Sequence, residues 1–137
     1  VKILAAANGT AIGTPDVSMF ADADEIDDWV KPYAAAAYNA GWFKGSMTSR
    51  GIEAKLSERV TRQDAMTLVY RVFFENETSD GHLAFSDSSK VSEYAADAVS
   101  YLTEQGIVSG FENGSLKPLD FLLREQIAKI LWVSIIK

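Results

Sequence analysis

The sequence predicts an all-α domain built from helix-loop-helix repeats. Three observations predict this fold: a set of residues recurs at a fixed offset, apolar residues recur at helical spacing inside each unit, and a glycine follows the first helix of each unit. The chain has 137 residues, 47% of them hydrophobic, which is enough for a packed core in a globular protein.

The repeat is visible as two motifs that lie 65 residues apart. Phe20-Ala21-Asp22 corresponds to Phe85-Ser86-Asp87, and further along, at an offset of 62, Arg62 corresponds to Arg124. The other paired positions are Trp29 with Tyr94, Gly41 with Gly106, and Gly45 with Gly110. We therefore expect repeats at residues 20–84 and 85–137, with three extra residues in the loop between the helices of the first.

A third copy is visible only in part. Val1-Lys2-Ile3-Leu4 is similar to Ala128-Lys129-Ile130-Leu131, and Leu4 precedes Phe20 by 16 residues, the spacing that also separates Val69 from Phe85. Residues 1–19 are therefore predicted to be the end of an upstream repeat followed by a linker. A single helix pair cannot bury its own apolar face, so neighbouring units are needed to complete a core.

The first helix of each repeat is predicted from an apolar stripe that ends at a glycine. Gly41 and Gly106 are placed to form left-handed C-terminal caps, and Pro32 fits such a helix only in its first turn. The stripes are Val30, Tyr33, Ala34 and Ala37 in one repeat and Ala95, Ala98, Val99 and Leu102 in the other.

The second helix of the 20–84 repeat is predicted to begin at a cap. The Thr61 hydroxyl can accept the Asp64 amide, and the acidic side chain suits the positive end of the helix. In the other repeat Leu123 replaces the threonine, at a cost of about 1 kcal/mol unless Asp120 caps instead. The predicted stripes are Ala65, Leu68, Val69 and Val72, and then Ile127, Ile130, Leu131 and either Ser134 or Ile135.

Composition excludes several classes of function. The net charge of −6 repels nucleic acid, and the absence of cysteine excludes disulfides and thiolate sites. The one histidine, His82, lies in a polar loop that no catalytic motif frames, so we expect neither an enzyme nor a cofactor. The acidic run at residues 22–28 lacks the glycine and final glutamate of a calcium loop, and no apolar run approaches the roughly 18 residues of a membrane span.

The matched residues resemble the S-layer homology family, whose repeat contains Phe-x-Asp, Gly-Ile-Val-x-Gly, Gly-x-Phe-x-Pro and Thr-Arg-Ala-Glu motifs. The 85–137 repeat is the closer match, and residues 46–59 of the other have lost the Gly-x-Phe-x-Pro pattern. The motifs that carry the resemblance there are Phe85-Ser86-Asp87, Gly106-Ile107-Val108-Ser109-Gly110, Gly114-Ser115-Leu116-Lys117-Pro118 and Leu123-Arg124-Glu125-Gln126.

The resemblance implies a pseudo-threefold assembly of three units, which binds secondary cell-wall polysaccharide, often through a ketal-pyruvate group. It further implies a secreted protein, non-covalently held at the bacterial cell surface, cell wall or S-layer. Arg62 and Arg124 are the expected ligands for the carboxylate, because a guanidinium offers two parallel hydrogen bonds and a helix end adds its free amides. Asp22 and Asp87 would order the groove or bind sugar hydroxyls.

The remaining site residues implied by the resemblance are Trp29, which would stack on a sugar ring, and Gly45 and Gly110, which would let the ligand approach the backbone. Each assignment has a structural alternative. The arginines could be surface residues paired with nearby carboxylates, Trp29 a core or staple residue at the helix start, and the aspartates turn formers. For the whole chain the alternative is a structural module that self-associates in a surface layer, and exposed apolar surface makes a homo-oligomer a further expectation.

Overall fold

The computed structural model describes residues 6, 9 and 12–136, with the side chain of Arg124 left out of that description. The chain forms two compact units, Val1–Glu58 and Arg59–Lys137. The predicted helix tail at residues 1–4 lies outside the described residues. The repeat boundary expected between residues 84 and 85 stays a prediction. The compact units are defined by contacts between residues, whereas the repeats are defined by similarity of sequence, so one does not test the other.

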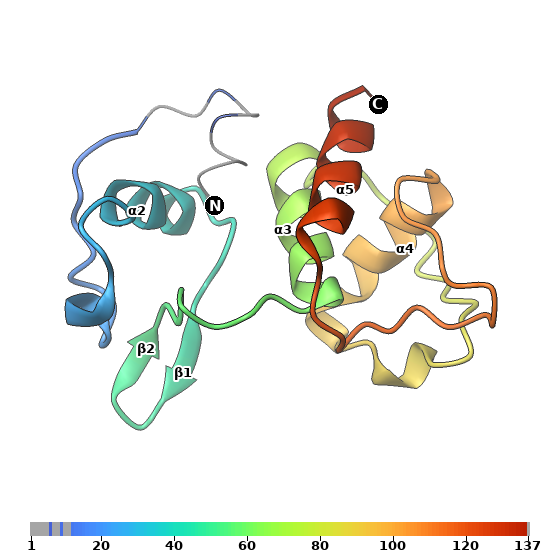
Figure 1. The fold of residues 1–137 in the computed structure, drawn as a ribbon, viewed down its shortest axis with the longest axis horizontal. Helices are drawn as coiled ribbons and strands as arrows, with labels where there is room; N and C mark the ends of the chain where they lie inside the picture. Colours follow the sequence, from blue (N-terminus) through green and yellow to red (C-terminus); the bar gives the residue numbers. More distant parts are fainter. Residues whose placement is uncertain (1–5, 7–8, 10–11, 137) are drawn as a thin grey trace. The chain divides into compact units, whose positions relative to one another are not determined.

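The described residues of the first unit form a helix and a short hairpin (Figure 1). Their small core is rich in aromatic rings. A 3-10 turn, η1 (Ala23–Glu25), precedes helix α2 (Lys31–Asn39). The Phe20 ring stacks on Phe43, with 5.7 Å between centroids, and meets Tyr38 edge-on at 5.1 Å. The buried residues of this core are Val17, Phe20, Ile26, Ala34 and Ala35.

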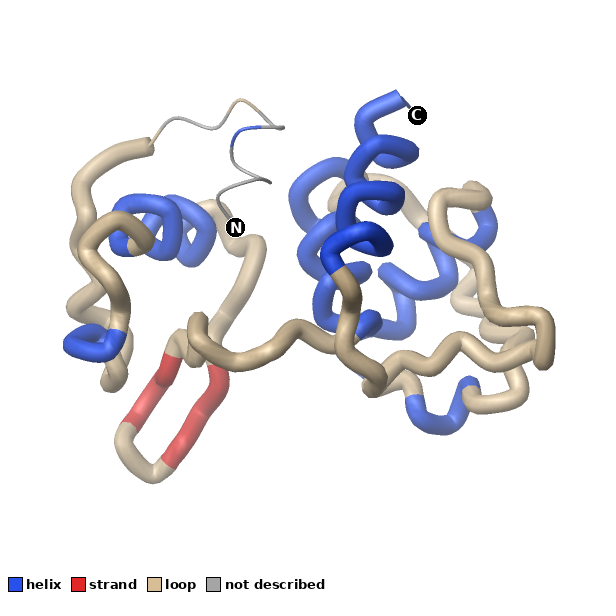
Figure 2. Tube along the Cα trace, in the orientation of Figure 1, coloured by secondary structure: helices blue, strands red, loops and turns tan. Residues whose placement is uncertain are grey.

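The loop that follows α2 contains a two-stranded antiparallel sheet, so the all-α prediction is wrong at this point (Figure 2). Strand β1 (Ser46–Thr48) pairs with β2 (Gly51–Glu53). The Thr48 hydroxyl closes the turn by donating to the carbonyl of Gly51, which has a φ of 119°. The three extra residues of this repeat fall in this segment, because the paired positions Gly45/Gly110 and Glu53/Ser115 flank it, and their length allows strands to form.

The second unit is helical. The 3-10 turns η2 (Ser88–Lys90) and η3 (Glu93–Ala95) lead into α4 (Ala96–Glu104). α3 (Arg62–Phe73) packs against α4 and against α5 (Arg124–Ile136). The predicted stripe of the first helix is confirmed here, with Ala95, Ala98, Val99 and Leu102 all buried.

The predicted stripe of α3 is only partly correct. Val69 is buried, whereas Ala65, Leu68 and Val72 are half-buried, and the fully buried apolar side chain is Met66. α3 has helices on two sides, so its buried face is wider and centred elsewhere than a single stripe predicts. On α5 the buried residues are Ile130, Leu131 and Ser134, while Ile135 is exposed. Of the two predicted positions, Ser134 is therefore the one that continues the buried stripe.

Two elements in the first half of each repeat lie at corresponding positions. α2 and α4 have the same length and lie 65 residues apart, and η1 and η2 are related in the same way. Gly41 and Gly106 follow these helices with φ values of 77° and 70°, as the predicted left-handed caps require. The division of the chain into repeats at residues 20–84 and 85–137 stays a prediction. A pseudo-threefold arrangement is not shown by these two units.

Candidate functional site

In the 85–137 repeat an aspartate fixes the loop between the two helices. Asp87 accepts the backbone N–H groups of Leu116 and Lys117, one on each carboxylate oxygen, at 2.8 Å and 2.9 Å. Lys117 sits in the left-handed region with a φ of 56°, which is unfavourable for a residue with a Cβ atom. The carboxylate therefore stabilises a backbone turn that the local sequence would not adopt unaided.

The 20–84 repeat contains the same arrangement. Asp22 accepts the N–H groups of Ala54 and Lys55, both at 2.8 Å, and Lys55 has a φ of 51°. Both aspartates thus form turns, as the structural alternative expected, and their contact with a ligand stays a prediction. Burial alone would raise the pKa of each carboxyl group, but the two amide hydrogen bonds outweigh it, and both pKa values lie below the ordinary 3.8.

Arg62 is the buried cation of the second unit. Only 6% of its surface is exposed, and its Nε donates to the carbonyl of Leu116 at 2.9 Å. Desolvation lowers the pKa of the guanidinium, and the nearby charge of Asp120 opposes that shift. The alternative of a surface arginine paired with Asp64 is therefore wrong for this residue.

The aromatic ring of Phe111 contacts both Arg62 and a second cation, Lys117. The Arg62 Cζ atom lies 4.9 Å from the centroid of the Phe111 ring, and the Lys117 Nζ atom lies 4.3 Å from the same centroid. Phe111 is 36% exposed, so the ring reaches solvent. Two positive charges thus meet at one partly exposed aromatic surface, an arrangement stabilised by about 0.5 to 2 kcal/mol for each cation.

The start of α3 is closed by protein groups. Arg62 and Gln63 donate their backbone N–H groups to the carbonyls of Asp120 and Pro118, at 2.8 Å and 2.9 Å. The Thr61 hydroxyl accepts the Asp64 amide at 3.3 Å, which confirms the predicted cap. The expectation that free amides at this helix end assist a ligand is therefore wrong, because the 118–120 loop occupies them.

A polar network joins the start of α3 to the segment before α4. Gln63 accepts the N–H of Ser92 and donates to its hydroxyl, each at 2.9 Å. The Tyr94 hydroxyl donates to Asp64 in a short hydrogen bond and accepts from Gln63. Burial, and then the bond to Asp64, raise the pKa of Tyr94. This network thus links the two repeats beside Arg62.

The glycines predicted to admit a ligand lie against the protein itself. A Cβ atom at Gly110 would lie 2.7 Å from Phe85 Cε1 and 2.9 Å from the Ser115 carbonyl oxygen. At Gly45 it would lie 2.7 Å from Ile52 Cγ2. These contacts require glycine without any ligand, and approach of a ligand to either position stays a prediction.

Trp29 and Arg124 are the two remaining predicted site residues. Trp29 is 62% exposed, so it is not a core residue, while a staple contact at the helix start and sugar stacking both stay predictions. The side chain of Arg124 lies outside the described residues. The N–H of Leu123, which precedes it, donates to Gln126 Oε1 at 3.0 Å. Capping of this helix by Asp120 stays a prediction.

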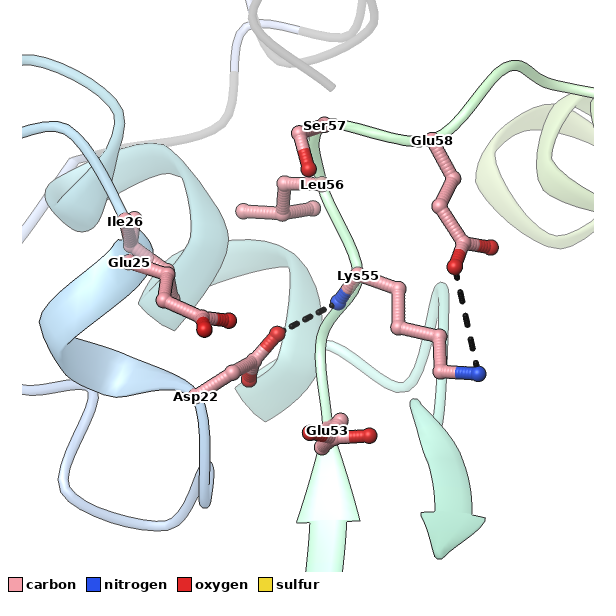
Figure 3. Close-up of a pocket in the computed structure, with 8 residues that line it drawn as sticks. All are labelled: Asp22, Glu25, Ile26, Glu53, Lys55, Leu56, Ser57 and Glu58. Carbon is pink, nitrogen blue, oxygen red and sulfur yellow. Dashed lines mark hydrogen bonds and ion pairs between the residues drawn. The ribbon is translucent and has the colours of Figure 1, made fainter.

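The 20–84 repeat has a small cavity of about 140 Å³ beside its aspartate turn (Figure 3). Its charged lining is four carboxylates and the single ammonium group of Lys55, which approaches Glu58 at 3.9 Å. At the corresponding positions of the other repeat, Lys90 replaces Glu25 and Ser115 replaces Glu53. The 20–84 cavity is thus acidic, and the equivalent surface of the 85–137 repeat is not.

Sequence reasoning missed Phe111 and Lys117. The loop of residues 111–118 could have indicated them, because it carries an aromatic residue and a lysine and folds back on the start of α3. Among the described residues, no group of three or more histidine, aspartate and glutamate side chains is placed to hold a metal ion. No helix in the described part of the chain has the length and apolar character needed to cross a bilayer.

Comparison with known proteins identifies the family of this region. Residues 84–128 match the family described as the S-layer homology domain. Residues 84–128 thus match this family, and the resemblance noted from the motifs of this segment is confirmed. Domains of this family anchor proteins to the cell wall, bind cell-wall polysaccharide, and occur in cell-surface or secreted proteins.

Two similar proteins are enzymes of much greater length. An amylopullulanase from Thermoanaerobacterium thermosulfurigenes is 28% identical over 109 residues, which cover 77% of this chain and 6% of that protein. An endoglucanase from Bacillus sp. (strain KSM-635) is 30% identical over 108 residues, which cover 76% of this chain and 11% of that protein. The alignments therefore span only a small part of each relative.

Proposed function

We propose that this chain is a non-catalytic module that attaches a larger exported protein to a bacterial cell wall by binding an acidic secondary cell-wall polysaccharide. The observation that carries the proposal is the placement of Arg62 and Lys117 at one aromatic ring, Phe111. An anionic sugar substituent such as a ketal-linked pyruvate is the chemical group that such a pair of cations suits.

The proposed site assigns a separate role to each member of the cluster. The Nε atom of Arg62 carries the bond to Leu116, so its terminal Nη groups are the donors that a carboxylate would use. Lys117 supplies a second, more accessible charge, and the exposed part of the Phe111 ring offers an apolar surface to the sugar. Asp87 acts on the ligand indirectly, by fixing the backbone of Lys117.

The charge of the surroundings favours the 85–137 repeat over the 20–84 cavity as the anion site. Glu25, Glu53 and Glu58 line that cavity and would repel a carboxylate. Arg124, Trp29, Gly45 and Gly110 remain candidates for contacts with neighbouring sugars. We include in the proposal that three such repeats form a pseudo-threefold assembly, which the equal lengths of α2 and α4 support.

The test is calorimetric titration with pyruvylated cell-wall polysaccharide and with the same polysaccharide after the pyruvate has been removed. Lys117→Gly removes the charge and places glycine at a φ of 56°, which glycine adopts readily, so the fold should be retained or stabilised. Lys55→Gly is the matched control, because Lys55 has the same turn and donates its N–H to the equivalent aspartate, Asp22. We expect Lys117→Gly to weaken binding about tenfold or more and Lys55→Gly to leave it nearly unchanged.

Equal losses in the two variants, or equal binding of both polysaccharides, would contradict the assignment of the anion site to the Phe111 cluster. An absence of binding by the folded parent chain would contradict polysaccharide anchoring itself. Arg62→Ala is a poor test on its own, because it also removes the buried bond to Leu116 and would lower stability. Circular dichroism of each variant separates loss of binding from loss of fold.

A further inference from the structure

Two lysines at equivalent positions of the repeats have different partners. In the 20–84 repeat the Lys55 Nζ atom lies 3.9 Å from Glu58 Oε1. In the 85–137 repeat the Lys117 Nζ atom lies 4.3 Å from the centroid of the Phe111 ring. Among the described side chains Lys117 forms no ion pair. One ammonium group is thus neutralised by an acid, and the other is left at an aromatic ring.

The backbone brings an acid to the lysine in both repeats. The N–H of Glu58 donates to the carbonyl of Lys55 at 3.1 Å. The N–H of Asp120 donates to the carbonyl of Lys117 at 3.2 Å, and the offset of 62 relates the two pairs. The turns are therefore alike, so the side chains alone decide whether the two charges meet.

The two acids differ in length by one methylene group. The contact between Lys55 and Glu58 is already long for an ion pair, so an acid shorter by one methylene falls out of reach. Asp120 is such an acid, and the Lys117 ammonium lies at the Phe111 ring instead. Residues 46–59 of the other repeat contain no aromatic residue that could compete for Lys55. The short acid and the ring thus act in the same direction.

The charge of Asp120 also acts on Arg62. Burial lowers the pKa of the Arg62 guanidinium, and the negative charge of Asp120 opposes that shift. The Asp120 side chain is exposed, so it lies on the side from which a ligand arrives. A carboxylate that binds Arg62 therefore enters the field of a like charge, which repels it.

We propose that Asp120 sets the affinity of the anion site formed by Arg62, Lys117 and Phe111, in two opposing ways. Its short side chain leaves Lys117 available to the ligand, and its charge competes with the ligand for the two cations. Asp120 is thus a positioning residue that acts through its neighbours. The inference rests on the proposed function, because it concerns the same site.

Two substitutions separate the reach of this acid from its charge. Asp120→Glu keeps the charge and adds the methylene, so it should pair with Lys117 and weaken binding of pyruvylated polysaccharide about two- to fivefold. Asp120→Asn keeps the size and removes the charge, so it should tighten binding about threefold at low ionic strength. Both variants keep the backbone hydrogen bonds of residue 120 with Lys117 and Arg62, so the fold should be retained.

Proton NMR of the ligand-free chain reports the position of Lys117 directly. Protons above an aromatic ring are shielded, so the ε-methylene protons of Lys117 should be shifted upfield in the parent. We expect Asp120→Asn to keep this shift and Asp120→Glu to lose it. Glu58→Asp is the matched control, and it should change neither the shift of Lys117 nor the binding of polysaccharide.

A Lys117→Gly background tests whether Asp120 acts through the lysine. In calorimetric titrations Asp120→Glu should have no further effect there, because its partner is absent. Asp120→Asn should still tighten binding in this background, because Arg62 remains. The two routes by which Asp120 acts are thereby measured separately.

Three results would overturn the proposal. An unchanged Lys117 shift in Asp120→Glu would show that the length of the acid does not decide the partner of the lysine. A loss of binding from Asp120→Glu that persists in the Lys117→Gly background would place its effect elsewhere. Weaker binding by Asp120→Asn would make the carboxylate a contact of the ligand and not its competitor. A parent chain that binds no polysaccharide would contradict the proposed function, while the NMR shift would still decide whether Asp120 controls Lys117.

Discussion

Lys55 and Lys117 occupy equivalent positions and share an unusual backbone conformation, with φ values of 51° and 56°. Each donates its N–H to the aspartate that begins its own repeat. A left-handed residue with a side chain costs roughly 1 to 2 kcal/mol, and the two carboxylate bonds offset that cost. The aspartate of the Phe-x-Asp motif thus stabilises the turn in the loop between the helices.

The first prediction concerns these aspartates. Asp87→Asn keeps one acceptor but turns an N–H₂ group toward the second backbone donor. We expect a loss of about 1 to 3 kcal/mol in the free energy of unfolding, measured by urea denaturation. Asp22→Asn should behave alike, because its geometry is the same, and Asp24→Asn, at an exposed position, serves as the control. An unchanged unfolding midpoint in Asp87→Asn would contradict a stabilising role for the turn.

The second prediction is a pH dependence. The folded pKa values of Asp22 and Asp87 lie below the ordinary 3.8, so their stabilisation is present above that pH and is lost as the pH falls through the folded values. Stability should therefore fall below a pH of about 4. The difference in unfolding free energy between parent and Asp22→Asn should narrow in the same range. A difference that stays constant from neutral to acidic pH would contradict this account.

The third prediction concerns Gly110. A Cβ atom there would lie within 3 Å of both Phe85 and the Ser115 carbonyl oxygen, so Gly110→Ala should destabilise the chain by about 1 to 3 kcal/mol. Gly13→Ala is the control, because a Cβ atom at Gly13 meets no atom within 4 Å. Thermal unfolding should give a lower melting temperature for the first variant alone. Equal melting temperatures would show that the loop relaxes around the methyl group.

The fourth prediction concerns the start of α5. Leu123 is 59% exposed and lies where Thr61 caps α3. Leu123→Thr should supply the missing cap and raise the free energy of unfolding by about 1 kcal/mol, because a threonine hydroxyl can accept the amide of the third helical residue. Thr61→Ala should lower it by a similar amount. A Leu123→Thr variant no more stable than the parent would mean that Gln126 already closes this helix end.

Helices and caps were predictable from the sequence because their signals are local. The Thr61 cap, the glycines after α2 and α4, and the buried stripe of α4 follow from residues within one or two turns. The hairpin was not predictable in the same way. Its strands have three residues each, too few for an alternating pattern to be recognised, and the turn depends on a side-chain bond from Thr48.

The site was predictable only where a motif marked it. Arg62 was predicted from its place in the repeat and from the family resemblance, but its burial depends on Leu116 and Phe111, about fifty residues away. The free amides expected at the start of α3 are absent from the site because the carbonyls of Pro118 and Asp120 reach them, a tertiary contact that no local pattern encodes. Met66 was missed because its position relative to two packed helices decides its burial.

The boundary between the compact units has a consequence for how such chains can be cut and lengthened. It falls at Glu58–Arg59, inside the 20–84 repeat, because α3 packs against α4 of the following repeat. The boundary of the compact units therefore does not coincide with the boundary of the predicted repeats. A fragment that ends at residue 84 would lack α4, so Met66 on α3 would become exposed. A fragment that begins after residue 58 would keep α3 packed against α4. Engineers who splice such repeats should join them between helices of the same repeat.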